Sequence, residues 1–406
     1  MVSKVSPAWL QEPSLVAVFD ALERGGGEVR VNGGAVRNTL MDEPVADVDL
    51  STTLHPQQVV EALANAGLKS VPTGIGHGTV TAVSGGVGYE VTTLREDVET
   101  DGRRAVVKFA TDWKKDALRR DLTMNALYLS RDGTIHDPLG GLEDLQARNV
   151  RFVGDAETRI NEDYLRILRF FRFFAWYGHG RPDAVGLKAT AKLKEGLAGL
   201  SAERVWSELS KLLAAPDPSR ALLWMRTTGI LTAILPESEK WGIDNIHPLI
   251  EAEADFSWTP DAIQRLQVII PPRDDIVDGL SSRLKVPNLV RDRLKAWANG
   301  TQSVSLESPE MVRAALYRGR KRRNAVIDQL KLEIVLAKED RAPLLELLAI
   351  ADAFAAPELP VKGQDLLDAG FEAGAALGTA LKRMEEAWIE SDFALDRDAL
   401  MALARK

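Results

Sequence analysis

The sequence predicts an α+β fold, in which an N-terminal domain with a mixed sheet and helices precedes an all-α remainder. Alternation of apolar and polar residues, which is typical of strands, is confined to the part of this 406-residue chain before residue 145. From there to the C-terminus, amphipathic segments with helical spacing follow one another between proline-containing breaks. Because 45% of the residues are hydrophobic, the chain can bury a large core, and its length favours two to four domains.

The N-terminal elements can be placed in order from their local patterns. They are a strand that ends at the glycine pair 33–34, a helix at 35–41, a strand at 46–52, a helix at 55–67, two strands within 78–94 joined by a glycine-rich turn, a helix running into a strand at 112–130, a turn at 131–134 and a loop at 136–145. The stretch 94–104 is charged and contains Asp-Gly, so we expect a mobile loop there. A long helix is expected over 161–178.

The residue content excludes several kinds of site. The chain has no cysteine, which rules out disulfides, zinc ribbons and thiol catalysis, and its five histidines are scattered. A bound metal must therefore rest on carboxylates. No stretch reaches about 18 consecutive apolar residues and the first residues lack an apolar signal core, so we expect a cytoplasmic protein without a membrane segment.

The net charge of −8 argues against a nucleic-acid partner, because phosphate contacts need lysine and arginine. The distribution of charge still allows one, since basic residues cluster within 103–120, 283–295 and 317–324. Each cluster could equally be a solvated helix face. The candidate RNA-binding residues in the last cluster are Arg320, Lys321, Arg322 and Arg323.

Two aspartates behind a glycine turn indicate the chemistry. On a strand, Asp47 and Asp49 point to the same face, and like charges this close either share a proton or bind a cation. Mg²⁺ prefers oxygen ligands of this kind together with phosphate oxygens. Upstream, Gly33 and Gly34 allow close backbone approach, the following helix offers N–H donors, and Arg37 adds a cation. The combination predicts a nucleoside triphosphate site, whereas the aspartates alone could be a polar strand edge.

A metal pair is better held with a third carboxylate on a neighbouring strand. Glu90 alternates with Tyr89 and Val91, so it is expected on the face opposite to theirs. With Asp47 and Asp49 it forms the predicted catalytic set, with the two aspartates as metal ligands. An ordinary exposed strand residue remains the alternative for Glu90.

Six motifs occur in a fixed order: GGAVRNTL with DVDLST, TGIGHGTVT, YEVTTLREDVETDGRR, RRDLTMNALYL, HDPLGGLEDL and NEDYLRILRFFRF. Together they closely resemble the bacterial class II CCA-adding tRNA nucleotidyltransferase and poly(A) polymerase family, within the polymerase-beta-like nucleotidyltransferases. The resemblance covers about residues 29–175. Two positions depart from it: Asn38 stands where aspartate is usual, and Leu122 where phenylalanine is usual. Neither replaces an expected ligand.

The resemblance implies a seahorse-like protein with a catalytic head at 1–145, a helical neck at 146–215, a body at 216–310 and a tRNA-binding tail at 311–406. It implies addition of C, C and A to tRNA 3′ ends from CTP and ATP without a nucleic-acid template, using two Mg²⁺ ions and releasing pyrophosphate. The helical part would grip the acceptor and T arms by shape and backbone contacts. We expect a monomer and no DNA partner.

The neck segment contains a candidate base-reading pair. Asp163 and Arg166 are three residues apart and Glu162 and Arg166 four apart, so they neighbour one another on a helix, and an ordinary ion pair is the simple interpretation. An acceptor beside a donor nevertheless matches the base edge that cytosine and adenine share, and it mismatches guanine and uracil. The resemblance assigns this role to Asp163 and Arg166, with Glu162 and Arg169 in support.

The remaining nucleotide-binding candidates lie in the fourth motif. Asp121 and Asn125 are four apart at the expected helix end and could both face a ribose, where the resemblance also places them. Arg120 could contact the triphosphate or tRNA, or be a plain solvated arginine. In the family, the loop that corresponds to 94–104 is linked to the switch from C to A addition.

Three functions of different classes are compatible with the sequence. Poly(A) polymerases of the family usually carry a GRRF-like basic motif after the aspartates and a strongly basic tail. Here the stretch 50–71 has Lys69 as its one lysine or arginine and the tail is mixed in charge, which favours CCA addition. A poly(A) polymerase or a partial CC- or A-adding enzyme is the second interpretation. A non-catalytic RNA-binding protein is the third, and the intact Asp47 and Asp49 argue against it.

Overall fold

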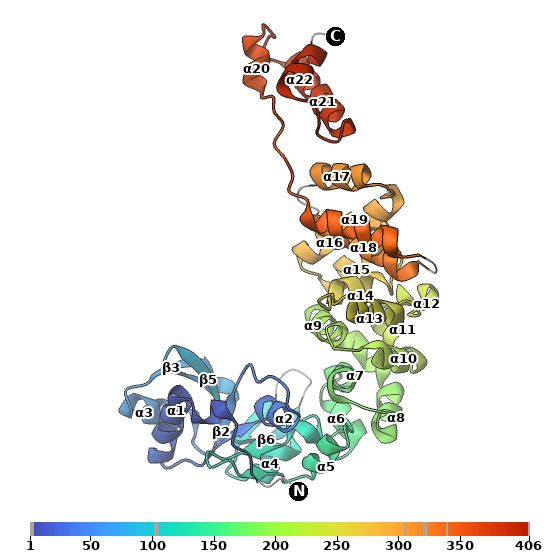
Figure 1. Cartoon of the computed structure of the whole chain (residues 1–406). Helices are drawn as coiled ribbons and strands as arrows, with labels where there is room; N and C mark the ends of the chain where they lie inside the picture. The colour runs from blue at the N-terminus through green and yellow to red at the C-terminus, as the bar shows by residue number, and fades with distance from the viewer. Residues whose placement is uncertain (1–3, 101–104, 304–305, 320–322, 338–339, 405–406) are drawn as a thin grey trace. The chain divides into compact units, whose positions relative to one another are not determined.

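The computed structural model describes residues 4–100, 105–303, 306–319, 323–337 and 340–404, excepting the side chains of 73, 97–100, 105–107 and 301–303. The chain divides into two compact units, Met1–Ile234 and Leu235–Lys406 (Figure 1). The first unit contains a sheet and helices and the second is helical, which confirms the predicted α+β class. The expected subdivision into head, neck, body and tail stays a prediction. Across the described residues, no helix is long and apolar enough to cross a membrane.

The head is built on a seven-stranded sheet with the order β3-β4-β5-β2-β1-β8-β9. Its strands are β1 (Val29–Asn32), β2 (Asp49–Thr52), β3 (Lys69–Gly74), β4 (Thr79–Ser84), β5 (Val87–Thr93), β8 (Tyr128–Leu129) and β9 (Ile135–His136). β2 and β5 run parallel, whereas β1 pairs antiparallel with both β2 and β8. β4 and β5 form the hairpin predicted from the glycine-rich turn, and Gly85 and Gly86 both have positive φ there.

Helices cover one face of this sheet. The head helices are α1 (Pro13–Arg24), α2 (Gly34–Leu40), α3 (Pro56–Asn65), α4 (Trp113–Leu118) and α5 (Gly141–Gln146), with short 3₁₀ turns η1 (Ala8–Gln11), η2 (Ile75–His77) and η3 (Thr123–Asn125). α1 and α3 pack against β4, and the Ser14 hydroxyl of α1 lies 2.8 Å from the Tyr89 hydroxyl of β5. Leu50, Val80 and Val91 are fully buried beneath them. Residues that alternate with these apolar side chains therefore face the opposite side of the sheet.

The prediction of a loop over 94–104 was wrong for its described part. Strands β6 (Arg95–Thr100) and β7 (Ala105–Phe109) pair antiparallel from Arg95 opposite Phe109 to Thr100 opposite Ala105. The valine-rich second half favours a strand, and Asp-Gly between two such runs is a hairpin signal. The high charge of the segment, which is typical of loops, concealed these two strand signals. Residues 101–104 of the predicted loop lie outside the described residues.

The helices that follow the head in the first unit are α6 (Ala156–Glu162), α7 (Leu165–Tyr177), α8 (Ala184–Lys192), the 3₁₀ segment η4 (Lys194–Gly199), α9 (Ala202–Leu213), α10 (Ser219–Thr227) and α11 (Ile230–Ile234). The expected continuous helix over 161–178 is broken, because Asp163 adopts an extended conformation with φ −158°. Its carboxylate accepts a hydrogen bond from the Leu165 N–H at 3.0 Å, which satisfies a backbone donor at the start of α7. The apolar face of α7 is buried along its length.

The second unit consists of α12 (Ser238–Trp241), α13 (Ile246–Asp255), α14 (Ala262–Gln267), α15 (Asp274–Leu284), α16 (Asn288–Ser303), α17 (Pro309–Arg318), α18 (Arg323–Leu336), α19 (Ala342–Ala353), α20 (Gly363–Asp368), α21 (Ala375–Glu390) and α22 (Arg397–Ala404). One apolar cluster joins α17, α18 and α19. A second cluster packs α20, α21 and α22 around Tyr317 of α17. The helical character predicted beyond residue 145 is thus confirmed in this unit.

Candidate active site

Three carboxylates converge on the face of the sheet that α1 and α3 leave open. Leu50 of β2 lies opposite Val91 of β5, so extending this parallel register by one residue places Asp49 opposite Glu90. Both side chains are exposed, whereas Leu50 and Val91 are buried on the other face. Asp47 directly precedes β2 and is also exposed. The predicted placement of Glu90 is confirmed, and the catalytic roles of all three stay predictions.

The electrostatics of Asp49 reflect this crowding. Partial desolvation by the surrounding protein raises the pKa of the Asp49 carboxyl above its ordinary value, although the side chain keeps contact with solvent. The negative charges of Glu90 and Asp47 raise that pKa further, and Arg120 works in the opposite direction. Carboxylates held together in this way favour either a shared proton or a cation.

The donor set suits a hard cation whose coordination sphere is completed by other molecules. In the described part of the chain, no group of three or more His, Cys, Asp or Glu side chains could hold a metal ion by itself. Mg²⁺ commonly binds through one or two carboxylates plus phosphate oxygens and water, and Asp47 and Asp49 are such a pair. The residues therefore fit a metal that arrives with a triphosphate.

Arg120 lies beside the carboxylates and is not a solvated surface arginine. Asn32 of β1 sits opposite Asp49 in the antiparallel register, and the Arg120 Nη1 donates to Asn32 Oδ1 at 3.0 Å. The amide of Asn32 in turn donates to the Ser51 hydroxyl at 2.9 Å. The side chain of Arg120 is 15% exposed. The structure therefore rejects the solvated alternative and places this cation close enough to Asp49 to act on the pKa of its carboxyl.

Asp116 holds Arg120 in place, and the sequence patterns did not single it out. It is fully buried and accepts bonds from Arg120 Nη2 at 3.1 Å, from Arg119 Nε at 2.8 Å and from the Tyr128 hydroxyl at 2.7 Å. Burial works to raise the pKa of the Asp116 carboxyl, but Arg120 and Arg119 outweigh it and hold that pKa below its ordinary value. Its i,i+3 and i,i+4 spacing to the two arginines was the available signal.

The glycine pair forms a tight turn between β1 and α2, next to two guanidinium groups. Gly33 has φ +65° and ψ −117°, a conformation that other residues rarely adopt. A Cβ built on Gly33 would lie 3.5 Å from Arg120 Nη1, and one built on Gly34 would lie 3.7 Å from Arg37 Nη2. The predicted combination of turn and arginine is therefore present, with Arg120 as a second cation.

The side chain of Arg37 is buried rather than exposed to solvent. Its side chain is 7% exposed and donates to Asn125 Oδ1 at 2.6 Å, to Asn38 Oδ1 at 2.8 Å and to the Tyr177 hydroxyl at 2.8 Å. Its guanidinium also lies 4.2 Å from the centre of the Tyr177 ring. Burial lowers the pKa of Arg37 from its ordinary value. Asn38, one of the two departures from the family pattern, thus contacts this cation directly.

Asp121 and Asn125 lie together as predicted, but within a network of side chains rather than at a helix end. Asn125 Nδ2 donates to Asp121 Oδ1 at 3.2 Å, and Arg169 Nε donates to Asp121 Oδ2 at 2.6 Å. Both residues are less than a tenth exposed. Arg169 was expected to support the base-reading pair; it binds Asp121 instead and ties α7 to the head. Burial works to raise the pKa of the Asp121 carboxyl, and Arg169 outweighs it to lower that pKa.

The base-reading candidates lie at the break between α6 and α7. Arg166 Nη1 donates to Glu162 Oε2 at 2.5 Å and to the Arg159 carbonyl at 3.0 Å. Asp163 does not pair with Arg166 in the described residues: its second carboxylate oxygen accepts from Arg204 Nη2 at 2.6 Å. Glu162 therefore contacts Arg166, and its supporting role stays a prediction. Arg204 of α9 contacts Asp163, which the sequence did not indicate.

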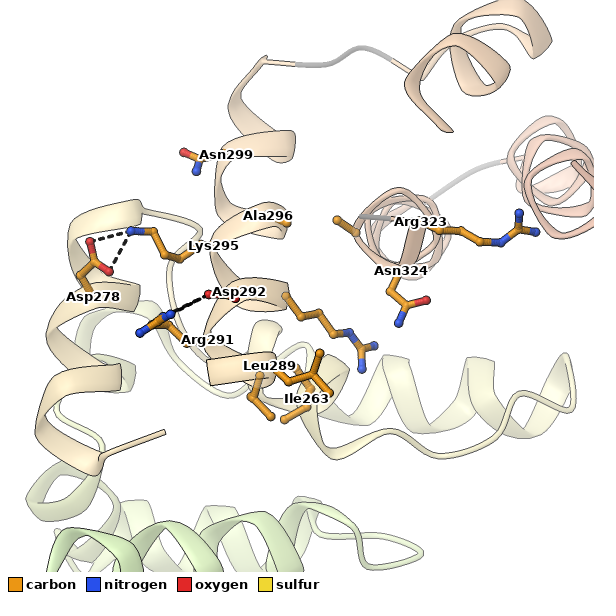
Figure 2. A pocket seen from close by; sticks show the side chains of 13 residues that line it. Ile263, Asp278, Leu289, Arg291, Asp292, Lys295, Ala296, Asn299, Arg323 and Asn324 are labelled. Atoms are coloured by element: carbon orange, nitrogen blue, oxygen red, sulfur yellow. Dashed lines mark hydrogen bonds and ion pairs between the residues drawn. The ribbon is translucent and has the colours of Figure 1, made fainter. Parts of the chain in front are cut away.

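In the second unit, two basic clusters that are distant in sequence line one groove of about 860 Å³. Figure 2 shows Lys295 bound to Asp278 and Arg291 bound to Asp292 in this groove, each at 2.9 Å. Arg323 belongs to the same lining, but its guanidinium donates to the backbone carbonyls of Ala351 and Phe354 at 2.7 Å each. The candidates Arg320, Lys321 and Arg322 lie outside the described residues.

Known proteins share both the sequence and the fold of this chain. Residues 29–151 match the model of the poly A polymerase head domain, and residues 185–241 match the probable RNA and SrmB-binding site of polymerase A. The chain is 35% identical to the mitochondrial CCA tRNA nucleotidyltransferase 1 of Homo sapiens, covering 98% of this chain and 93% of that one. The chain belongs to the CCA-adding tRNA nucleotidyltransferase family. A CCA-adding enzyme of Leuconostoc mesenteroides is 31% identical, with 96% and 95% covered.

The structures of family members agree with this assignment. The CCA-adding enzyme of Bacillus stearothermophilus in complex with CTP aligns with a TM-score of 0.76 and 27% identity, covering 97% of this chain and 96% of that one. The Thermotoga maritima CCA-adding enzyme, complexed with tRNA, shares the fold with a TM-score of 0.69 and 19% identity, covering 100% of this chain and 97% of that one. The family membership inferred from six sequence motifs is therefore confirmed.

Proposed function

We propose that this chain adds C, C and A to the 3′ end of tRNA, taking the nucleotides from CTP and ATP and releasing pyrophosphate. The observation that carries the proposal is its similarity, over nearly the whole length of both chains, to enzymes named for this activity. A cytoplasmic location and a monomeric state remain expectations from the sequence, and the animal relatives are named as mitochondrial enzymes.

The carboxylate face of the head supports the chemistry of nucleotidyl transfer. Asp47 and Asp49 would hold Mg²⁺, with Glu90 adjacent to Asp49. When bound, two such ions supply stabilisation of the attacking 3′-hydroxyl and of the pyrophosphate leaving group. The protein needs no separate general base, so the task of its side chains is to position the reactants. Desolvation and the charges of Glu90 and Asp47 raise the pKa of the Asp49 carboxyl, and a bound cation would offset the repulsion among the three carboxylates.

The glycine turn is the proposed triphosphate contact. Arg120 lies next to Gly33 and Arg37 next to Gly34, so both cations flank the point where the backbone permits close approach. Asn32 links this turn to Asp49, because it precedes Gly33 and sits opposite Asp49 in the sheet. The triphosphate would thus lie between these cations and the metal-binding carboxylates.

Asp163 and Arg166 are the proposed base-reading pair. The two N–H groups of Arg166 Nη1 are taken by Glu162 and the Arg159 carbonyl, and Nη2 donates to the Arg119 carbonyl at 3.5 Å, which fixes the guanidinium. Arg204 and the Leu165 N–H fix the Asp163 carboxylate in the same way. Glu162 holds Arg166 and Arg204 holds Asp163, so the two side chains do not pair with each other. The Asp163 carboxylate can then act as acceptor, and the Arg166 guanidinium as donor, toward the same base. A mismatched base would leave buried polar groups unpaired, which costs about 1 to 3 kcal/mol each.

The groove of the second unit is the proposed contact for the tRNA backbone. Its lining carries Arg291, Arg293, Lys295 and Arg323 against Asp278 and Asp292. Lys295 and Arg291 now pair with Asp278 and Asp292, and phosphate groups would exchange with these two carboxylates. Binding is therefore expected to weaken as salt rises. The acceptor and T arms are the parts of tRNA that we expect to be held.

The deciding experiment supplies the purified protein with tRNAs that end before CCA, after C and after CC. Each is incubated with Mg²⁺ and one nucleoside triphosphate at a time, and the products are sequenced. We expect C on the first two acceptors, A on the third and no further growth. A long adenosine tail would instead establish the poly(A) polymerase alternative, and a product arrested after CC would establish a CC-adding enzyme.

A further inference from the structure

One face of α7 connects the two halves of the proposed nucleotide site. Arg166, Arg169, Phe173 and Tyr177 recur at spacings of three and four residues, so they lie along one side of the helix. Arg166 belongs to the base-reading pair at the first turn, and Arg169 binds Asp121 of the head. Tyr177 ends the helix about 16 Å further along. That end contacts Arg37 next to the glycine turn.

Tyr177 contacts Arg37 both through its hydroxyl and through the face of its ring. The Tyr177 hydroxyl accepts from Arg37 Nη2 at 2.8 Å and donates to Asn38 Oδ1 at 3.4 Å. The Arg37 guanidinium also lies 4.2 Å from the Tyr177 ring centre and 5.1 Å from that of Phe173. Tyr177 is itself 9% exposed, so this contact is largely shielded from solvent.

The partners of Arg37 orient its charge without neutralising it. Its hydrogen-bond acceptors among the described residues are the amide oxygens of Asn38 and Asn125 and the Tyr177 hydroxyl, all of which are neutral. The Asp121 carboxylate, which acts on Arg37 at longer range, is already bonded to Arg169. A buried guanidinium whose direct partners are neutral gains from an anion that reaches it. Gly34 adjoins this guanidinium, since a Cβ built there would lie 3.7 Å from Arg37 Nη2, and the absence of a side chain leaves that space open.

We propose that Tyr177 is a positioning residue for the triphosphate, because its hydroxyl and ring hold Arg37 against the Gly33–Gly34 turn. The inference rests on the proposed function in one respect, that Arg37 receives phosphate oxygens. It goes beyond that function in assigning a role to a neck residue that touches neither metal nor base. Through α7, the same helix then fixes both the phosphate-binding cation and the base-reading Arg166.

The test measures the binding of inorganic tripolyphosphate by titration calorimetry in Mg²⁺ buffer. In parallel, the KM for CTP and the KM for ATP are measured in the nucleotide-addition assay. Tyr177→Phe keeps the ring and removes the hydroxyl, which leaves one charged donor without its acceptor. We expect affinity for tripolyphosphate to fall about tenfold, as for loss of a hydrogen bond to a charged group. KM for CTP and ATP should rise by the same factor, with kcat and the preference over UTP unchanged. Tyr177→Leu, which also removes the ring, should lose at least a further fivefold.

Two controls separate positioning from helix stability. Trp176→Phe alters the adjacent residue of α7 and removes its hydrogen bond to the Lys211 carbonyl, so it should leave tripolyphosphate affinity within about twofold. In an Arg37→Met background, Tyr177→Phe should have no further effect, because the two residues act through one contact.

The results that would overturn the inference are specific. Unchanged tripolyphosphate affinity in Tyr177→Phe, or an effect that persists in the Arg37→Met background, would make Tyr177 a packing residue only. A wild-type protein that binds tripolyphosphate and responds as expected, but adds no CCA, would overturn the proposed function and leave this inference standing. A wild-type protein that binds neither tripolyphosphate nor CTP would overturn both.

Discussion

Replacing Asp116 by asparagine tests the buried charge network behind the active site. Asp116 is fully buried on α4 and joins three side chains, Arg119, Arg120 and Tyr128. The substitution keeps the size of the side chain and removes its charge. Two largely buried guanidinium groups, 16% and 15% exposed, then lose their shared carboxylate.

The expected loss of stability follows from the cost of an unpaired buried cation. Removing one partner of a buried ion pair typically costs about 3 to 5 kcal/mol. The remaining exposure of Arg119 and Arg120 allows some solvation, and asparagine retains one acceptor oxygen, so we expect about 3 kcal/mol. With a urea dependence of about 2 to 3 kcal/mol per molar for a unit of this size, the midpoint of unfolding should fall by about 1 M.

The assay is urea unfolding of the full chain, followed by the fluorescence of its nine tryptophans. One of them, Trp113, contacts Tyr128 edge to face at 5.1 Å. Glu157→Gln is the matched control, since it neutralises a carboxylate in an exposed pair with Lys192 and should cost less than about 1 kcal/mol. A fall of the midpoint in Asp116→Asn no larger than in the control would refute the network.

The pH dependence provides an independent check on Asp116. Its pKa is lowered in the folded protein, so its stabilising effect is present above the pKa of about 3.9 in the unfolded chain. This effect is lost as pH falls through the lower folded value. The difference between wild type and Asp116→Asn should therefore be full at pH 7 and shrink below about pH 4. A difference that does not change with pH would mean that the carboxylate is not the stabilising species.

Further substitutions address the other parts of the protein. Asp47→Ala or Asp49→Ala should each reduce nucleotide addition at least a thousandfold with unchanged circular dichroism, and near-normal rates would remove the metal assignment. Arg166→Ala should relax the choice of CTP and ATP over UTP and GTP about ten- to hundredfold, as measured by kcat/KM for each nucleotide, and unchanged selectivity would end the base-reading proposal. Arg323→Met should destabilise the second unit by about 1 to 2 kcal/mol in urea unfolding, because its guanidinium satisfies carbonyls at the end of α19. If Arg323→Met instead weakens tRNA binding and leaves the free energy of unfolding unchanged, the main role of Arg323 is to contact tRNA in the groove.

The positions of site residues could be predicted from the sequence where they follow from local patterns, such as the two-residue repeat of a strand. Asp49 and Glu90 follow the two-residue repeat of their strands, so their shared face could be inferred once both strands were recognised. Gly33 marks a conformation that other residues resist, which made the turn visible in the sequence. The α+β division followed from the same periodicities, since they change once, near residue 145.

The parts that could not be predicted depend on contacts between distant segments. The sequence offers Arg37 as a cation beside the glycine turn, and nothing within its helix indicates that the side chain is buried. The side chain is buried by Tyr177, which is 140 residues away. Likewise Arg204 holds Asp163 across 41 residues. The break at Asp163 did have a local signal, because an aspartate immediately before an apolar run is typical of a helix start. The strong helical pattern on both sides of Asp163 concealed this signal.

The network around Asp121 joins α7 to the sheet-containing part of the first unit, Met1–Ile234. Asp121 accepts from Arg169 of α7 on one side and from Asn125 on the other, and Asn125 accepts from Arg37. Arg37, Asp121 and Asn125 are buried and Arg169 is 33% exposed, so disruption at the buried members is costly. A neck helix held to the head at Asp121 and again at Arg37 cannot rotate about either contact alone. The proposed base-reading end of α7 is therefore kept at a fixed distance from the proposed triphosphate turn, which would favour selection of the correct nucleotide.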